Sequence, residues 1–474
     1  MSISLSLDRL QHAVRHLPKY TRPTCHVAGT NGKGSVTAIV SSILRATSPP
    51  LNIGRYNSPH LVTIHDCIVI NDNPVDAEVY DSVRAEIEGM DAEQGTNLSN
   101  FELLTLTALQ IFERIGVDIA VVEVGMGGRL DATNIIPDEA ILVSALTNVD
   151  LDHQAFLGDT VSAIAKEKAG IARTGRPFVL GPQKYSEVVD VVKGVLLEKG
   201  SQMVPLLAVH SLENTAPPSL SLWPPAFQPP RIGKISCTLP AFMEEIVTNF
   251  PLRGQYQVEN LATALTVISA LIMTKTLVDK NFTDLFTPPV LVRGINKVQW
   301  RGRLSFHTIP SPKLLPVLVD GAHNPASAET LADYVNHILL HSIDPVIDLT
   351  YILALSHSPP KTPLQTLSPI LLPHLSTGPF NRVRVHIALT YFSPPAGMPW
   401  VKPVPPRDLA EVVRNLIPTV DIWVVGDDTE PGQSLLAAID WAASHTENAG
   451  LVVIAGSLYL VADFYRVYKG NIDT

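Results

Sequence analysis

The chain has 474 residues, which is too long for a single hydrophobic core, so we expect two domains. Its 45 acidic and 35 basic side chains give a formal net charge of −10, which argues against nucleic acid or an anionic membrane as the main partner. The three cysteines are odd in number and far apart, which supports neither a disulfide framework nor a zinc ribbon and indicates a reducing compartment.

The chain opens with a predicted helix. Leu7, Leu10, Val14 and Leu17 recur at the spacing of one helical face. Since this helix leaves little room for a removable presequence, we expect a cytoplasmic protein. No apolar run has the length and composition of a membrane span; the best, 261–273, contains Thr and Ser and predicts a buried helix.

A glycine loop at residues 29–35 follows a short apolar run and precedes a helical pattern. Its three glycines let the backbone turn tightly and direct several N–H groups at one anion, while Lys33 adds a positive charge and Ser35 a hydroxyl at a helix N-terminus. Val27 replaces the first glycine of the strict P-loop pattern, and Gly34 stands where its hydroxyl residue would follow the lysine, so the loop is a variant. We expect it to bind nucleotide phosphates; a turn without a ligand is the less favoured alternative.

Apolar strand patterns alternate with helical patterns from residue 20 to about 180, which predicts an α/β domain with a mostly parallel sheet. The clearest strands, 119–123 and 140–145, are continuous apolar runs and not alternating ones, as expected where helices cover both faces of a sheet. Residues 178–181 are a further strand candidate.

A second alternation begins at the predicted strand 316–320 and ends at 451–457, and we place the domain boundary near Arg303. Two proline-rich tracts, 205–235 and 358–379, interrupt the periodic patterns and predict surface loops.

Polar residues that follow predicted strands are candidates for chemistry. Glu123 lies at the carboxyl end of a strand, where open α/β sheets bind ligands, and a carboxylate beside a phosphate loop can hold Mg²⁺. A surface acid is the alternative. His153 follows the next strand and could complete a metal shell or orient a phosphate, although a lone histidine is more often an ordinary loop residue. Lys168 ends a helical pattern, where lysines usually complement the helix dipole, so chemistry alone does not select it.

In the second domain, Asp320 ends a predicted strand and could bind a ribose. The alternative is that Asp320 to Asn324 form a turn and helix cap. Arg303, at the domain junction, could reach a phosphate.

Seven stretches together resemble the folylpolyglutamate synthase and dihydrofolate synthase family, whose members are related to the Mur amino-acid ligases. They occur in the family's order over nearly the whole chain: 29–35, 57–61, 123–134, 152–158, 167–171, 301–303 and 320–325. The resemblance implies a Mur-ligase-like α/β fold. A P-loop-type, ATP-binding N-terminal domain would span residues 1–303, and a smaller Rossmann-like glutamate-ligase domain residues 304–474.

The resemblance also implies roles for individual residues. ATP would be bound at the positions Thr30, Asn31, Gly32, Lys33, Gly34, Ser35, Asn260, Arg303 and Asp320, and Mg²⁺ at Ser58, Glu123 and His153. The lysine that matches Lys168 is carbamylated in some members, which would turn a cation into an anionic Mg²⁺ ligand. The candidate catalytic residues are then Lys33, Lys168, His153 and His323. The pterin substrate would lie against Leu5, Ser6, Leu7, Phe101, Glu102, Leu130, Asp131 and Ala132.

The implied reaction is amide ligation, in which ATP phosphorylates a carboxylate and the amine of L-glutamate attacks the acyl phosphate. Carboxylate and γ-phosphate repel each other, so Lys33, Arg303 and Mg²⁺ are needed to spread the charge. In the family, polyglutamate synthases carry an Arg-Glu-Arg type segment where this chain has 62–68. The stretches 101–105, 397–400 and 456–460 look more like the monofunctional dihydrofolate synthases of folate-making eukaryotes.

We therefore expect a monomer that ligates glutamate to 7,8-dihydropteroate. A folylpolyglutamate synthase acting on tetrahydrofolate, alone or as a bifunctional enzyme, is the first alternative. A nucleotide-binding module without catalysis is a remote one. Two residues depart from the family pattern: Asn57 stands where many members have Ser or Thr, and Arg301 adds a charge just before Arg303.

Overall fold

The computed structural model describes residues 6–212, 220–224, 227–242, 244–273, 282–310, 313–371, 383–395, 398, 401–447 and 449–468. The predicted substrate residue Leu5 and parts of the tracts 205–235, 358–379 and 397–400 lie outside these ranges. The chain divides into two compact units. The first unit ends at Gln299, and most of the second unit follows from Trp300 onward, close to the boundary expected near Arg303. The second unit also includes the described residues of 220–232 and the short segment Leu252–Gly254.

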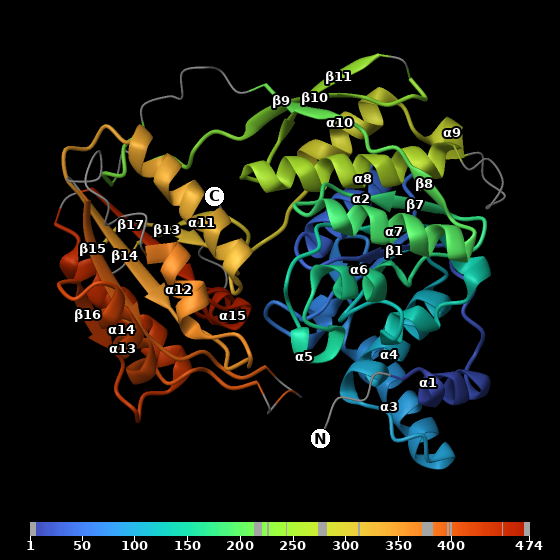
Figure 1. Cartoon of the computed structure of the whole chain (residues 1–474), viewed down its shortest axis with the longest axis horizontal. Helices are drawn as coiled ribbons and strands as arrows, with labels where there is room; N and C mark the ends of the chain where they lie inside the picture. The colour runs from blue at the N-terminus through green and yellow to red at the C-terminus, as the bar shows by residue number, and fades with distance from the viewer. Residues whose placement is uncertain are drawn as a thin grey trace. The chain divides into compact units, whose positions relative to one another are not determined.

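The first unit is built on a sheet that has eight strands within the described part of the chain, in the order β4-β3-β2-β5-β1-β6-β7-β8 (Figure 1). Neighbouring strands are parallel from β2 to β8, and β3 and β4 extend the sheet with antiparallel pairs. The strands are β1 (Thr24–Ala28), β2 (Ile53–Tyr56), β3 (Ile68–Ile70), β4 (Asn73–Pro74), β5 (Ile119–Glu123), β6 (Ile141–Leu146), β7 (Pro177–Leu180) and β8 (Gln202–Val204). The three strands predicted in this region are therefore confirmed as β5, β6 and β7.

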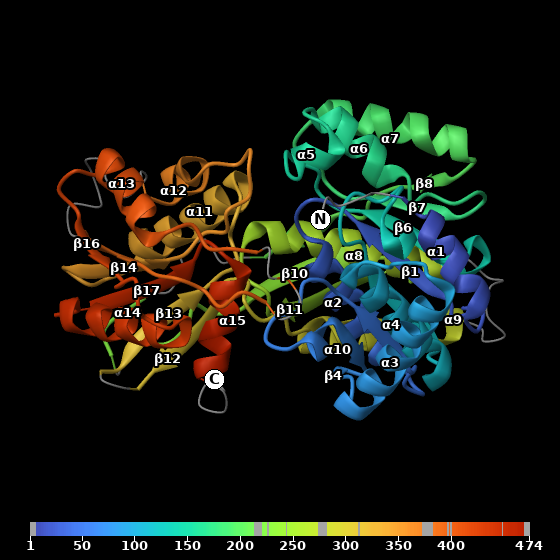
Figure 2. The same ribbon diagram turned by 90° about the horizontal axis from the view of Figure 1, so that it is seen from below.

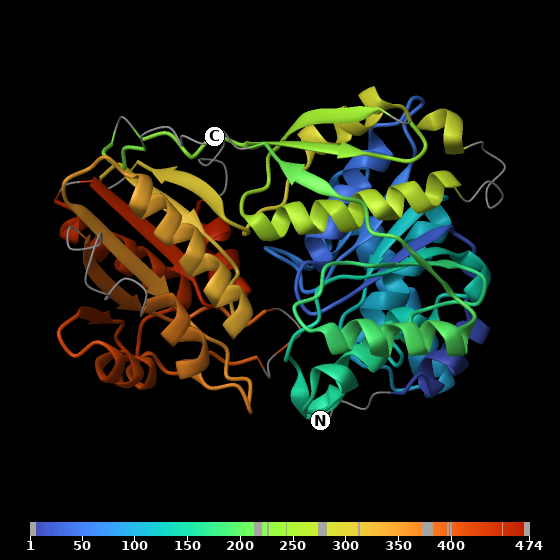
Figure 3. The same ribbon diagram turned by 45° about the horizontal axis from the view of Figure 1, so that its top comes forward.

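Helices cover both faces of this sheet (Figures 1 and 3). One face carries α2 (Lys33–Arg45), α8 (Gln255–Met273) and α10 (Pro288–Lys297). The other face carries α3 (Ala77–Gln94), α4 (Asn100–Ile115), α6 (Val161–Ala169) and α7 (Ser186–Lys199), with α1 (Asp8–Ala13) beside them. Shorter helices are η1 (Val14–His16), η2 (Ile64–Cys67), η3 (Ala132–Ile135), η4 (Asp138–Ala140), α5 (Gln154–Leu157) and α9 (Phe282–Leu285).

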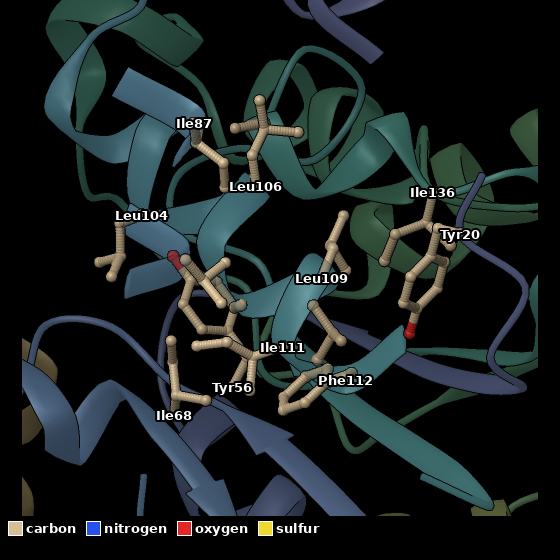
Figure 4. Close-up of a cluster of buried hydrophobic side chains, with 14 of the residues drawn as sticks. Tyr20, Tyr56, Ile68, Ile87, Leu104, Leu106, Leu109, Ile111, Phe112 and Ile136 are labelled. Carbon is tan, nitrogen blue, oxygen red and sulfur yellow. The ribbon is translucent and has the colours of Figure 1, made fainter. Parts of the chain in front are cut away.

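The face under α4 holds a large apolar cluster, to which α4 contributes residues at helical spacing (Figure 4). Leu104, Leu109 and Phe112 of α4 are buried, and Tyr56 of β2 is fully enclosed. Burial of one such side chain contributes roughly 1.5–3 kcal/mol. The first predicted helix is also confirmed, because Leu7 and Leu10 pack against the same cluster.

The helix α8 is the only described helix that is long and apolar enough to cross a membrane by length and composition, but 83% of its apolar window is buried in the protein. This agrees with the predicted buried helix at 261–273. Beside α8 and α10 lies a small antiparallel sheet of β9 (Val209–Ser211), β10 (Gly233–Thr238) and β11 (Glu245–Phe250), ordered β11-β10-β9. The proline-rich tract 205–235 is thus not only loop: β9 and the start of β10 fall inside it.

The second unit is a smaller α/β domain whose described residues form a six-stranded sheet, in the order β12-β13-β17-β14-β15-β16. Its strands are β12 (Ser305–Ile309), β13 (Leu315–Val319), β14 (Ile347–Leu353), β15 (Val383–Leu389), β16 (Asp421–Val424) and β17 (Ala449–Ala455). Only the β12–β13 pair is antiparallel among these described strands.

Figure 2 shows helices on both faces of this second sheet. They are α11 (Pro325–His341), α12 (Pro363–Leu371) and α13 (Pro406–Leu416) on one face, and α14 (Pro431–His445) and α15 (Leu458–Val467) on the other. The strands predicted at 316–320 and 451–457 are confirmed as β13 and β17. The tract 358–379 includes a helix, α12, which the prolines had hidden from the prediction.

Candidate active site

The predicted phosphate loop connects β1 to α2, as expected from the sequence. Gly32 is the N-cap of α2 and has a left-handed backbone, with φ +93°. A Cβ atom at Gly32 would overlap the side-chain oxygen of Asn260, and one at Gly29 would overlap the hydroxyl of Thr147. Glycine is therefore needed at both positions. Asn260 of α8 thus lies against the glycine loop, and both were predicted to bind ATP.

The loop is tied to the segment that follows β6. The Thr30 N–H donates to the Asn148 carbonyl at 2.8 Å, and the Asp150 N–H donates to the Thr30 hydroxyl at 3.0 Å. The Thr147 hydroxyl donates to the Asn31 carbonyl at 2.7 Å. These bonds bring the predicted phosphate loop next to the segment that leads to His153.

Lys33 and Glu123 meet at the edge of the sheet. The Lys33 Nζ atom lies 3.9 Å from Glu123 Oε1 and donates to the Thr30 carbonyl at 3.2 Å. Both side chains are largely buried, with 15% of Lys33 and 8% of Glu123 exposed. Because β5 pairs with β1, the carboxyl end of β5 places Glu123 beside the phosphate loop, as the strand pattern predicted.

Asn57 is the second partner of Glu123. It follows β2, and its side-chain amide donates to Glu123 Oε2 and to the Thr37 hydroxyl, each at 2.7 Å. Ser58, which was predicted to bind Mg²⁺, comes next in the chain and is half-buried. The sequence reasoning gave Asn57 no role, although its departure from the family pattern one residue before Ser58 was a usable signal.

Lys168 is not a surface residue at a helix end. It lies in the last turn of α6, only 2% of it is exposed, and its Nζ donates to the Gly29 carbonyl at 2.8 Å. Burial, together with the positive charge of nearby Lys33, lowers the pKa of Lys168 to about 7. A substantial fraction of this amine is therefore neutral near neutral pH. The interpretation of Lys168 as a residue that complements the helix dipole is wrong, because tertiary packing encloses it beside the phosphate loop.

His153 stands at the N-terminal end of α5 with a left-handed backbone, φ +53°, and its N–H donates to Asp152. Among the described residues, no three His, Cys, Asp or Glu side chains converge as a metal cluster. A cation here would therefore take most of its ligands from phosphate oxygens and water, as Mg²⁺ does in many nucleotide sites. A metal shell shared by Ser58, Glu123 and His153 stays a prediction.

Three of the residues predicted to contact the pterin belong to the apolar cluster or pack against it. Leu7 and Phe101 pack against it and Ala132 is part of it, while the Phe101 ring lies so close to Gly125 that a Cβ there would overlap it. Leu130 is half-buried in the same loop. Leu7, Phe101 and Ala132 thus adjoin one apolar cluster although they come from three separate segments, and their contact with a pterin stays a prediction.

Asp131 in this loop is held by a buried network. Its carboxylate accepts from the Met126 N–H at 2.8 Å and from the N–H and hydroxyl of Thr133, at 3.0 and 2.5 Å. His26 Nε2 lies 2.8 Å from the same hydroxyl. Burial raises the pKa of Asp131 and lowers that of His26 to about 3, so His26 stays neutral. Sequence reasoning missed His26 and Thr133, although a polar residue inside the apolar strand β1 indicates a buried partner.

Two other predicted substrate residues have structural tasks. Glu102 accepts from the Ser99 N–H at 2.7 Å in a capping box at the start of α4, and forms a 2.9 Å ion pair with Arg9. Ser6 exchanges hydrogen bonds with Asp8 at the start of α1. Their contact with a pterin stays a prediction.

In the second unit, Asp320 follows β13 and is buried. Its carboxylate accepts from the N–H groups of Leu304 and Ala322, each at 2.8 Å, and burial raises its pKa. Arg303 packs on Gly321, and His323 Nδ1 lies 2.9 Å from the Gly321 carbonyl. Asn324 caps α11 through a capping box. The turn-and-cap alternative therefore describes the local hydrogen bonds, while binding of ATP at Arg303, Asp320 and His323 stays a prediction.

Comparisons with known proteins agree with these motifs. A family model described as the dihydrofolate synthetase C-terminal domain matches residues 304–467. A dihydrofolate synthetase of Saccharomyces cerevisiae is 32% identical over 480 residues, covering 100% of both chains. A probable dihydrofolate synthetase of Schizosaccharomyces pombe is 33% identical over 99% of both. A folylpolyglutamate synthase of Lacticaseibacillus casei is 34% identical over 67% of this chain and 68% of its own.

Solved structures share the fold along the whole chain. A Mycobacterium tuberculosis folylpolyglutamate synthase complexed with ADP and AMPPCP has a TM-score of 0.75 at 25% identity and covers 99% of this chain and 96% of its own. Escherichia coli FolC in complex with DHPP and ADP has a TM-score of 0.72 at 25% identity, with coverages of 98% and 94%. A bifunctional folylpolyglutamate synthase/dihydrofolate synthase with Mn, AMPPNP and L-glutamate bound has a TM-score of 0.69 at 25% identity, with coverages of 98% and 94%.

Proposed function

The chain belongs to the dihydrofolate synthetase and folylpolyglutamate synthase family, and from this premise we propose that it is an ATP-dependent ligase that joins L-glutamate to 7,8-dihydropteroate. The products are 7,8-dihydrofolate, ADP and phosphate. The observation that carries this proposal is the convergence of Lys33, Glu123 and Lys168 on the phosphate loop, in a chain that aligns end to end with dihydrofolate synthetases.

The choice of acceptor rests on which part of the chain aligns with which relatives. Both dihydrofolate synthetases align over 99% or more of this chain, whereas the folylpolyglutamate synthase aligns over 67% of it at a similar identity. The family model that matches the second unit also carries the dihydrofolate synthetase description. Folylpolyglutamate synthesis is the second candidate function, because solved relatives with that activity share the fold over nearly the whole chain.

The chemistry follows from charge. The pteroate carboxylate attacks the γ-phosphorus of ATP, the bond to the bridging oxygen breaks, and ADP leaves with that electron pair. The glutamate amine then attacks the acyl carbon, loses a proton, and phosphate departs. Lys33 and the backbone N–H groups of the glycine loop offset the repulsion between carboxylate and phosphate in the first step.

The residues present fit a divalent cation. Glu123 supplies a carboxylate and Ser58 a hydroxyl, which are ligands that Mg²⁺ prefers, and a relative with Mn and AMPPNP bound supports the use of a metal with ATP. When bound, the cation would neutralise phosphate charge. Glu123 beside Lys33 would hold it at the edge of the sheet.

We include carbamylation of Lys168 in the proposal. The neutral amine attacks CO₂ and releases a proton, forming a carbamate that retains one N–H. That N–H can keep the hydrogen bond to the Gly29 carbonyl. The carbamate is negatively charged, so Lys33 would attract it, whereas Lys33 repels the unmodified ammonium group. The buried, partly neutral amine supports this modification.

A monomeric state and a cytoplasmic location complete the proposal. They are supported by the net charge of −10 and by the three cysteines, which are all buried and form no disulfide with one another.

The test is release of ADP by the purified protein with ATP, Mg²⁺ and glutamate, with dihydropteroate or tetrahydrofolate as the acceptor. We expect release with dihydropteroate only. Release with tetrahydrofolate alone would replace the proposal by polyglutamylation, and release with both would establish a bifunctional enzyme. No release with either acceptor, while ADP still binds, would favour the remote alternative of a binding module.

A further inference from the structure

We propose that Asn57 is a positioning residue that holds Glu123 in the orientation needed for the cation of a Mg²⁺–nucleotide complex. Asn57 is 5% exposed, and its backbone N–H donates to the Cys67 carbonyl at 2.9 Å. This bond fixes the residue between β2 and β3, one position before Ser58. The inference rests on the proposed use of ATP and Mg²⁺, and it concerns a residue to which the family resemblance gives no role.

The hydrogen bonds fix which way the side-chain amide points. The Thr37 hydroxyl donates its single hydrogen to the Gly34 carbonyl at 2.9 Å, so it can only accept from Asn57. The two hydrogens of the Asn57 amide therefore go to Thr37 and to Glu123 Oε2. The reversed amide would place its oxygen against a carboxylate oxygen and against a hydroxyl that has no spare hydrogen.

This arrangement joins Glu123 through Asn57 to Thr37 of α2, one helical turn after Lys33. With Oε2 held by the amide, Oε1 is the oxygen that lies toward Lys33, at 3.9 Å. Glu123 is thereby oriented so that one defined carboxylate oxygen faces the phosphate side. A hydroxyl residue has one hydrogen to donate, so a Ser or Thr at this position could not donate to Glu123 and to Thr37 at once.

The amide oxygen of Asn57 gives a second observation. This atom is buried and has no hydrogen-bond partner in the part of the chain that the structure describes. Buried acceptors are normally satisfied, so Oδ1 is not used to hold the fold. The two donated bonds and this unused acceptor together indicate that the Asn57 side chain orients Glu123 and does not serve to stabilise the fold.

The experiment compares binding of ADP by calorimetry in Mg²⁺, in Mn²⁺ and in EDTA, for the wild type, Asn57→Leu and Asn57→Ser. The measured quantity is the ratio of ADP affinity with metal to that without it. Loss of a residue that orients a metal ligand typically lowers metal affinity by about 10–100-fold. We therefore expect Asn57→Leu to lower the ratio by roughly tenfold while affinity in EDTA is retained, and Asn57→Ser to lie between.

Thr37→Val is the matched control. It removes the other bond of the same amide but leaves the bond to Glu123, so it should lower the ratio less than Asn57→Leu. A wild-type ratio in both Asn57 variants would overturn the inference, as would an equal loss of affinity with and without metal, which would indicate a purely structural role. If Asn57→Leu does not fold, Asn57→Ser decides by the same criteria. A wild type whose ADP affinity does not depend on metal would instead refute the proposed use of Mg²⁺.

Discussion

Replacing Lys168 by Met should make the first unit more stable below neutral pH, although it removes a residue of the candidate active site. The substitution keeps most of the side-chain volume and deletes the amine that is enclosed beside Gly29. A buried ammonium is costly unless it is well paired, and Lys168 has a second cation, Lys33, close to it.

The size and sign of the effect follow from the pKa of Lys168, which burial lowers from 10.5 to about 7. Between these values the unfolded chain binds the proton and the folded protein does not, so the wild type gains stability as the pH rises, by about 1.4 kcal/mol per pH unit. Below pH 7 both states are protonated and the full penalty, on the order of 4–5 kcal/mol, is present. Losing the bond to the Gly29 carbonyl offsets about 1–3 kcal/mol of the gain in Lys168→Met.

The assay must report on the first unit. All five tryptophans fall in the sequence ranges of the second unit, so tryptophan fluorescence serves as an internal control there. Hydrogen exchange of amides in β1 and α6, measured in CO₂-free buffer from pH 6 to 9.5, gives the free energy of unfolding of the first unit for both proteins. The advantage of Lys168→Met should shrink steadily above pH 7.

A difference between the two proteins that does not change with pH would refute the reasoning, because it would mean that Lys168 titrates alike in both states. Bicarbonate gives a separate outcome. If Lys168 is carbamylated, added bicarbonate should stabilise the wild type and leave Lys168→Met unchanged.

Three further predictions concern neighbouring residues. Lys33→Ala should lower kcat by at least about 10²-fold with little loss of stability, because it removes the charge proposed to act on the transferred phosphate. Near-normal turnover in a steady-state assay would contradict this role of Lys33. Gly32→Ala should destabilise the protein by about 1–2 kcal/mol or more, because the backbone at Gly32 is left-handed and a Cβ would overlap Asn260. The same change should weaken ADP binding. Thermal unfolding checks the first effect and calorimetry the second. Thr133→Val should lower the free energy of unfolding by about 1–3 kcal/mol, because Asp131 loses a hydroxyl donor. It should also raise the KM for dihydropteroate more than it changes kcat. Equal KM values for variant and wild type in a steady-state assay would show that Thr133 does not influence substrate binding.

Much of the fold could be predicted from periodicity. The strands β5, β6, β13 and β17 contain continuous apolar runs because both faces of a parallel sheet are covered, and such runs are visible without any tertiary information. The helix α12 escaped because its prolines matched a loop pattern, although one of them lies at its first position, which helices tolerate. The short strands β9 and β10 escaped because their pairing depends on partners distant in the sequence.

The candidate site was predicted as far as local geometry allows. A glycine loop between a strand and a helix, and an acid at the end of a strand, have positions that follow from the chain itself, so Lys33 and Glu123 could be placed from sequence. Asn57 could not, because its two bonds reach one residue 20 positions away and another 66 positions away.

The sequence by itself determined the alternation of strands and helices, the division into two parts and the family, because these depend on patterns within short stretches and on motifs in a fixed order. Only the tertiary structure decided the state of Lys168. A lysine near the end of a helix is charged and solvated unless other segments enclose it, and here the crossing of α6 over the phosphate loop removes water from the amine. Desolvation is a property of the assembled fold, which is why no local pattern could indicate it.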